Sequence, residues 1–247
     1  MEGYDPQQAF ARSRIYQLLS GAFLYPGDDF FALLHQGYFI EELREWGEFL
    51  PDGPKNGFLQ KLREQGAAFK GLSLEELKLE YGRVLGHSVS KDCPPCETEY
   101  GVHHVFQQTQ TLADISGFYR AFGLEVSQEQ GERLDHIGVE LEFMGFLAYK
   151  EYYASARHGE DKVQICRDAQ QKFLKENLGR WAPLFLRLLM NKATNGFYYG
   201  LGALTEEFLK TEMRFFKVHP EPIGELQPQR YEFDDTCVSC VNNSEKL

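Results

Sequence analysis

Helical spacing of apolar residues is the feature that most constrains the fold of this chain, because no segment shows the alternation typical of a β-strand. The longest such pattern is predicted to begin at a capping motif formed by Ser127 and Gln130 and to end near Tyr153. Its apolar positions recur three and four residues apart: Leu134, Ile137, Leu141, Met144 and Ala148. This spacing puts the side chains on one face of a helix. The sequence therefore predicts an all-α fold.

Shorter segments repeat the helical pattern and are separated by Pro and Gly. Asp5 before Pro6 predicts a helix start, because Asp caps the first turn and Pro fits its first position. Ser73 and Glu76 predict another start with a capping box. The helices expected besides the longest one are 6–24, 30–36, 40–49, 58–70, 74–84, 111–122, 161–177, 181–191 and 196–216. We therefore expect a helical-bundle-like architecture.

The C-terminal segment differs in composition from the rest. Prolines and a glycine recur after residue 216, and they disfavour a helix. A chain of 247 residues with 43% hydrophobic residues can bury the core of one domain. We expect one all-helical domain at residues 1–216 and a non-helical tail at residues 217–247.

A loop stiffened by two prolines, Cys93–Tyr100, lies between two helical patterns and presents carboxylates and an aromatic ring. Asp135 and His136 are expected at the exposed edge of the longest helix, where truncation would cost little stability. Glu140 would follow one turn after His136. These polar groups lie beside an apolar stripe, which suggests a cleft for a peptide. Arginines followed by apolar residues would suit it, because a guanidinium donates two hydrogen bonds to a carboxylate.

The order of several motifs resembles that of the TorD/DmsD/NarJ family. The matching segments are Glu80-Tyr81 with Leu85, Pro94 to Tyr100, Phe118-Tyr119 to Leu124, and Asp135 to Met144. The match is good over residues 75–155, and the flanking segments share only their helical character. Thr98 stands where the family usually has Ser, and Cys96 stands where an aromatic residue is common.

This family consists of cytoplasmic chaperones that bind the signal peptide or the body of a molybdoenzyme subunit until its cofactor is inserted. The resemblance implies a redox-enzyme maturation chaperone, which acts by binding and is not an enzyme. Its partner would be the catalytic subunit of a molybdopterin oxidoreductase with its twin-arginine leader. The chaperone would require no cofactor and would act in the cytoplasm. Domain-swapped dimers occur among relatives, so the oligomeric state stays open.

Six residues form the candidate peptide-binding site: Pro94, Pro95, Glu97, Asp135, His136 and Glu140. The resemblance supports Asp135 and His136, because an Asp-His pair belongs to the peptide-binding site proposed for the family. Taken alone, these polar groups also fit the solvated face of an amphipathic helix. Glu97 has two interpretations, a peptide contact or a hydrogen bond to the loop backbone, whereas Tyr100 is expected in the core.

Four of the five cysteines form two Cys-x-x-Cys pairs, Cys93 with Cys96 and Cys237 with Cys240. Four thiolates could hold a zinc ion or an iron–sulfur centre and so dock the tail on the loop. The other interpretation is that these thiols are not linked. Cys166 lies in a helical pattern and is expected to take no part. The pairs support an alternative function, a metal- or redox-sensing helical protein.

Charge and missing motifs exclude several other classes. The net charge of −11 and the pI near 5.2 argue against nucleic acid and anionic membrane surfaces, and they favour a basic partner. No run of about 18 apolar residues is present, so stable membrane insertion is not expected. Arg12 and Arg14 interrupt the first apolar pattern, which argues against a secretory leader. The motifs of P-loop enzymes, serine hydrolases and zinc proteases are absent from the sequence.

Overall fold

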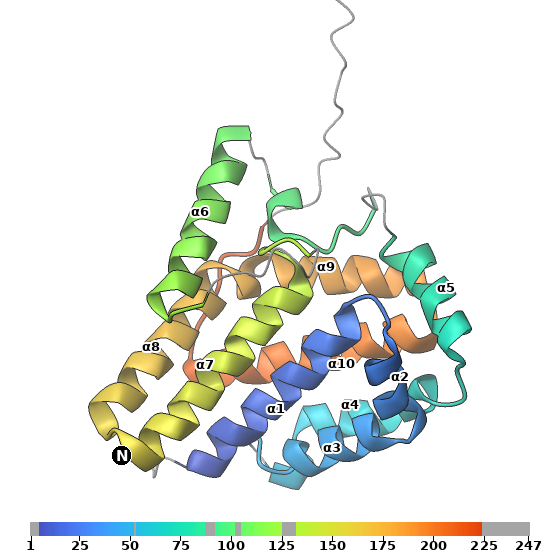
Figure 1. Cartoon of the computed structure of the whole chain (residues 1–247). Coiled ribbons are helices and arrows are strands. Elements are labelled where there is room, and N and C mark those ends of the chain that lie inside the picture. Colours follow the sequence, from blue (N-terminus) through green and yellow to red (C-terminus); the bar gives the residue numbers. More distant parts are fainter. Residues whose placement is uncertain (1–4, 52, 87–91, 102–104, 125–131, 224–247) are drawn as a thin grey trace, which may run out of the picture.

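The computed structural model describes residues 5–51, 53–86, 92–101, 105–124 and 132–223 (Figure 1). Within these ranges the chain forms ten α-helices and no strand, which confirms the predicted all-α fold. The helices are α1 (Pro6–Phe23), α2 (Asp28–His35), α3 (Tyr38–Gly47), α4 (Gly57–Gln65), α5 (Leu74–Val84), α6 (Val105–Ala121), α7 (Ile137–Arg157), α8 (Glu160–Glu176), α9 (Leu178–Ala193) and α10 (Gly196–Phe216). Residues 217–223 are non-helical, as predicted, and residues 224–247 of the expected tail lie outside the described ranges.

Two of the predicted helix starts are confirmed and a third is wrong. Asp5 caps α1 by accepting a hydrogen bond from the Gln7 N–H at 2.9 Å, and a capping box opens α5. The predicted cap of the longest helix, Ser127, lies outside the described residues. The helix itself begins only at Ile137, because the backbone of His136 is extended and its ring caps the first turn.

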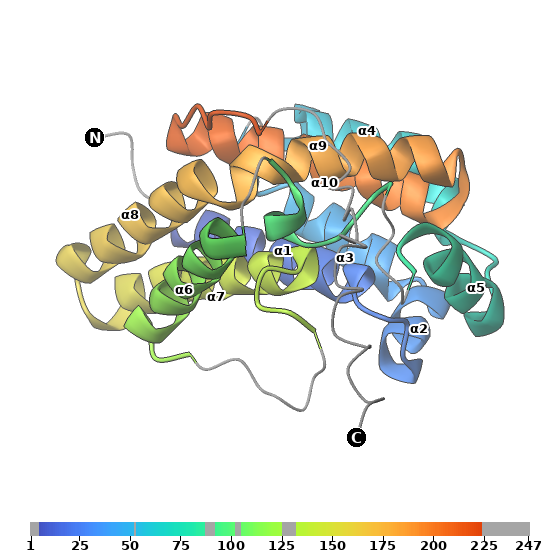
Figure 2. The ribbon, with the colours of Figure 1, turned by 90° about the horizontal axis from the view of Figure 1, so that it is seen from above.

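Helices α1 and α7 lie side by side and antiparallel at the centre of the molecule (Figures 1 and 2). The hydroxyls of Ser13 and Ser20 each donate to a carbonyl on α7, of Gly145 and Gly138 respectively, at 2.8 Å. A Cβ atom at Gly145 would lie 3.3 Å from the Ser13 carbonyl oxygen, so glycine permits this close approach. The central pair is flanked by α8 on α7 and by α3 on α1, and α9 pairs with α10.

A buried charge network joins the first and last helices. Arg12 of α1 donates to Glu212 of α10 at 2.7 Å through both Nε and Nη2, and to Glu151 of α7 at 3.1 Å. Gln170 of α8 accepts from Arg12 at 2.6 Å, and Arg167 pairs with Glu151 at 3.0 Å. Although burial opposes its charge, the carboxylates raise the pKa of Arg12, so the guanidinium stays ionised. We call these five residues the Arg12 network.

No helix in the described ranges is both long and apolar enough to cross a bilayer.

Candidate functional site

Backbone hydrogen bonds join the Pro-Pro loop, Cys93–Tyr100, to the start of α7. The N–H of Ile137 donates to the Pro95 carbonyl at 2.8 Å, and the N–H of Glu97 donates to the Asp135 carbonyl at 2.9 Å. These bonds form an isolated antiparallel bridge, after which Glu97–Glu99 makes one 3₁₀ turn. Two of the four segments that carry the family resemblance, Pro94 to Tyr100 and Asp135 to Met144, therefore meet at one junction.

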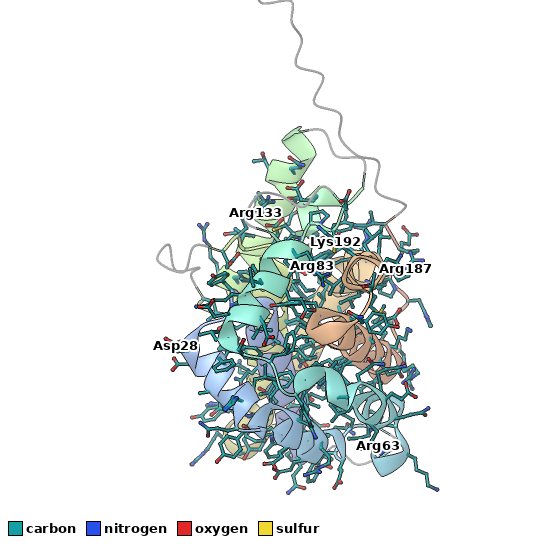
Figure 3. The ribbon with its side chains drawn as sticks, turned by 90° about the vertical axis from the view of Figure 1, so that its right-hand side faces the viewer. Asp28, Arg63, Arg83, Arg133, Arg187 and Lys192 are labelled. Atoms are coloured by element: carbon teal, nitrogen blue, oxygen red, sulfur yellow. The ribbon has the colours of Figure 1, made fainter. Side chains whose placement is uncertain are left out.

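The Asp135 carboxylate anchors this junction. It accepts hydrogen bonds from the Thr98 N–H at 3.1 Å and from the Thr98 hydroxyl at 2.8 Å. Arg133, which lies at the loop end of the molecule (Figure 3), donates to Asp135 at 2.9 and 3.0 Å and to Glu99 at 2.8 Å. The exposed position expected for Asp135 is wrong: its exposed fraction is 0%, because the loop covers it.

His136 is also buried, at 2% exposure, so the exposed helix edge expected there is wrong too. Its Nδ1 accepts from the Gly138 N–H at 3.1 Å. Burial lowers the pKa of His136 to about 4, so the ring is neutral and carries its proton on Nε2. That atom has no hydrogen-bond partner among the described residues and lies 3.9 Å from the Glu132 carboxylate.

Glu97 and Glu140 form a buried carboxyl pair. Trp181 Nε1 donates to Glu140 Oε2 at 3.1 Å, and Asn177 donates to Glu97 Oε2 at 3.3 Å. Because the two carboxyl groups are neighbours in a buried site, repulsion between two negative charges favours one proton held by the pair. Burial raises the pKa of Glu97 to about 7 and that of Glu140 well above its ordinary value. The Glu97 carboxylate thus accepts from the side chain of Asn177, at the junction of α8 and α9, and not from a described N–H of its own loop.

The side chain of Tyr100 packs beneath the Pro-Pro loop. It is fully buried, its hydroxyl donates to the Pro94 carbonyl at 2.7 Å, and its ring centroid lies 5.2 Å from that of Trp181. The predicted core position of Tyr100 is confirmed. Sequence reasoning missed Arg133, Trp181 and Asn177. Only the place of Arg133, two residues before Asp135, could have signalled its role.

A groove of about 790 Å³ opens beside the carboxyl pair, between α6 and α8. In Figure 2, α6 lies alongside both α7 and α8, and ring contacts join Phe118 to Phe173 at 5.4 Å and Tyr119 to Phe143 at 4.5 Å. The groove is lined by Glu97, Thr111, Ala113, Asp114, Gly117, Phe118, Ala121, Phe122, Ile165, Asp168, Ala169, Lys172, Glu176, Asn177, Arg180 and Ile223. Of the six predicted site residues, Glu97 is the one that lines it.

The structure gives no support for the predicted metal site. Cys93 and Cys96 are buried free thiols, and burial raises the pKa of both, that of Cys93 to about 12. Cys237 and Cys240 lie outside the described residues. Within the described part of the chain, no three His, Cys, Asp or Glu side chains cluster as metal ligands would. Cys166 is buried on α8, as a packing thiol would be.

The fold and the junction define a class, a helical bundle whose Pro-Pro loop closes on an Asp-His helix start. The chain belongs to the nitrate reductase delta subunit family, whose profile matches residues 42–187, and the relationship to TorD is confirmed. It is 28% identical over 209 residues to the perchlorate reductase assembly chaperone protein of Dechloromonas aromatica, which covers 83% of this chain and 90% of that protein.

Two further relatives match shorter stretches. The selenate reductase assembly chaperone protein of Thauera selenatis is 32% identical over 116 residues, covering 47% of this chain and 58% of that protein. The chaperone protein TorD of Aliivibrio fischeri is 28% identical over 102 residues, covering 41% of this chain and 46% of that protein.

Proposed function

We propose that this protein is an assembly chaperone for a molybdopterin oxidoreductase and acts by binding rather than by catalysis. Family membership and the names of two relatives as reductase assembly chaperones support this role. The observation that carries it is the junction itself, where two of the segments shared with the family meet beside an open groove. The metal- or redox-sensing alternative has no comparable support.

The finer part of the proposal concerns the client. We propose that the chaperone holds the twin-arginine leader or the apo catalytic subunit until the cofactor is inserted. Because the leader must be retained before export, this step would take place in the cytoplasm. The net charge of −11 suits a leader that carries arginines.

The six predicted site residues divide into two groups under this proposal. Pro94, Asp135, His136 and Glu140 are buried, so we assign them and the half-buried Pro95 to holding the loop in place: they are positioning residues. Glu97 is also buried, at 3% exposure, but it forms part of the groove wall and is therefore the candidate for direct contact. Direct contact with the buried group would require the loop to leave α7.

Calorimetric titration of the full chain with a synthetic twin-arginine leader peptide tests the proposal. We expect saturable binding that weakens with added salt, because charge attraction is screened over about 8 Å near physiological ionic strength. A peptide with lysines in place of the arginine pair should bind more weakly, since an ammonium lacks the two-pronged donor geometry. If neither the leader nor the apo catalytic subunit binds, the proposed function is wrong.

The proposed chaperone role needs no cofactor, and the four-cysteine site is a separate prediction that rests on spacing alone. Elemental analysis of anaerobically purified protein tests it. One zinc per chain that is lost in Cys237→Ser would support the site, and a metal content near zero would refute it.

A further inference from the structure

The α6–α8 groove has apolar walls that remain open to water. Phe118 and Phe122 of α6 are half-buried, and Ala169 of α8 faces the same groove. Ile165 is 49% exposed, which is unusual for a large aliphatic side chain on a helix that also contributes to the core. Gly117 exposes the backbone of α6, and a Cβ atom there would meet no atom within 4 Å. A segment placed in the groove would therefore bury apolar surface.

The charges around these walls are mainly negative. Four carboxylates and two cations line the groove. Asp114 and Asp168 each accept a hydrogen bond from a neutral glutamine amide on their own helix, at 2.9 and 2.7 Å. Of the two cations, Lys172 pairs with Glu176 at 3.9 Å and Arg180 donates to the Glu221 carbonyl at 3.3 Å. The groove therefore favours a cationic ligand.

We propose that this groove binds a client peptide segment in which arginine lies next to apolar residues, with the guanidinium against Glu97. Glu97 is 3% exposed and forms part of the groove wall, so a guanidinium that reaches it is removed from water. The rings of α6 and the aliphatic residues of α8 then cover the apolar part of the segment. This inference rests on the chaperone function proposed above and names the surface that performs it.

Charge complementarity favours a client segment over the chain's own tail. The described chain ends at Ile223, which borders the groove, and residues 224–247 follow it. Those residues carry five carboxylates and only two cations, so their net charge has the same sign as that of the groove. Like charges oppose docking of the tail.

Binding of arginine would change the protonation of the carboxyl pair. Burial, together with Asp135, raises the pKa of Glu97, while the hydrogen bond from Asn177 and the charge of Arg180 lower it. An additional guanidinium beside Glu97 acts in the same direction as Arg180. We therefore expect the complex to release protons near neutral pH, and we expect this release to be lost in Glu97→Gln.

Two pairs of variants test the groove with the twin-arginine leader peptide. Gly117→Leu fills the groove, whereas Gly82→Leu on α5 places the same side chain at another exposed helical glycine with open space around it. Ile165→Lys adds a repelling charge to the groove, whereas Leu79→Lys adds the same charge outside it, at an exposed aliphatic residue on α5. We expect both groove variants to bind at least tenfold more weakly and both controls to bind like the wild type.

The outcomes separate the groove from the general function. If the wild type binds the leader and Gly117→Leu and Ile165→Lys bind it equally well, the groove assignment is wrong and the chaperone function stands. If the wild type does not bind the leader, the peptide-binding function itself fails. A synthetic peptide of residues 224–247 that displaces the leader would overturn the client assignment in favour of the tail. Equal calorimetric enthalpies in buffers of different ionisation enthalpy would contradict the contact with Glu97.

Discussion

The Arg12 network and the Glu97–Glu140 pair are both buried and both depend on carboxylates, yet they differ in charge balance. In the Arg12 network two guanidinium groups face two carboxylates, and every charge has a partner within 3.1 Å. In the pair, two carboxyl groups are neighbours, and burial together with their mutual repulsion favours one proton held by the pair. A network with equal numbers of opposite charges can hold helices together at any pH near neutrality. A pair of like-charged groups can instead change its protonation when a cationic ligand binds beside it.

The largest expected effect is a loss of stability when the Arg12 network is disrupted. Arg12→Ala should lower the free energy of unfolding by about 3–5 kcal/mol, because it leaves buried carboxylates without a cation. Chemical denaturation measures this loss. As a control, Arg14→Ala removes a half-exposed pair with Glu42, with side-chain exposures of 35% and 28%, and should cost less than about 1 kcal/mol. Equal losses of unfolding free energy in the two variants would show that the buried Arg12 network contributes no more to stability than an exposed ion pair.

Truncation of the loop anchor should have the next largest effect. Asp135→Ala removes the acceptor of buried hydrogen bonds from Thr98 and Arg133 and should cost about 2–3 kcal/mol. A loss of this size would contradict the expectation from the sequence, which places Asp135 at an exposed helix edge where truncation costs little stability. Thermal unfolding gives the stability loss, and limited proteolysis should show cleavage within Cys93–Tyr100 sooner than in the wild type. An unchanged melting temperature would mean that the loop does not depend on this anchor.

The smallest expected effect depends on pH and concerns the unbalanced pair. In the folded chain the pKa of Glu97 is raised from 4.5 to about 7, so the folded state keeps a proton that the unfolded chain releases. Its contribution to stability therefore falls as the pH rises from about 4.5 to about 7. His136 has the opposite effect: its pKa is lowered from 6.5 to about 4, so its contribution rises with pH across that window.

Because these contributions oppose each other, a comparison of Glu97→Gln with the wild type is more informative than either curve alone. The unfolding free energy of Glu97→Gln relative to the wild type should increase by about 1 kcal/mol per pH unit between about pH 5 and pH 7. Glu176→Gln, on an exposed side chain of the same groove, serves as the control and should run parallel to the wild type. A constant difference for Glu97→Gln would refute the shared proton.

Much of the fold follows from local sequence, and the site follows from it only in part. The helix expected at 196–216 has the same bounds in the structure, because helical spacing is a local signal. The burial of Asp135 and His136 was not predictable, because the residues that cover them lie about forty positions away in the chain. Nor did any pattern indicate that α6 would lie beside α8, which supplies the second wall of the groove.

The contact between Arg12 and Glu212 also affects how the chain can fold during its synthesis. Arg12 and Glu212 are separated by 200 residues, a distance that a ribosome adding roughly 5–20 residues per second covers in roughly 10–40 s. During that time the Arg12 guanidinium on α1 lacks its principal acceptor. The charge of Arg12 is therefore fully balanced only after α10 has been synthesised.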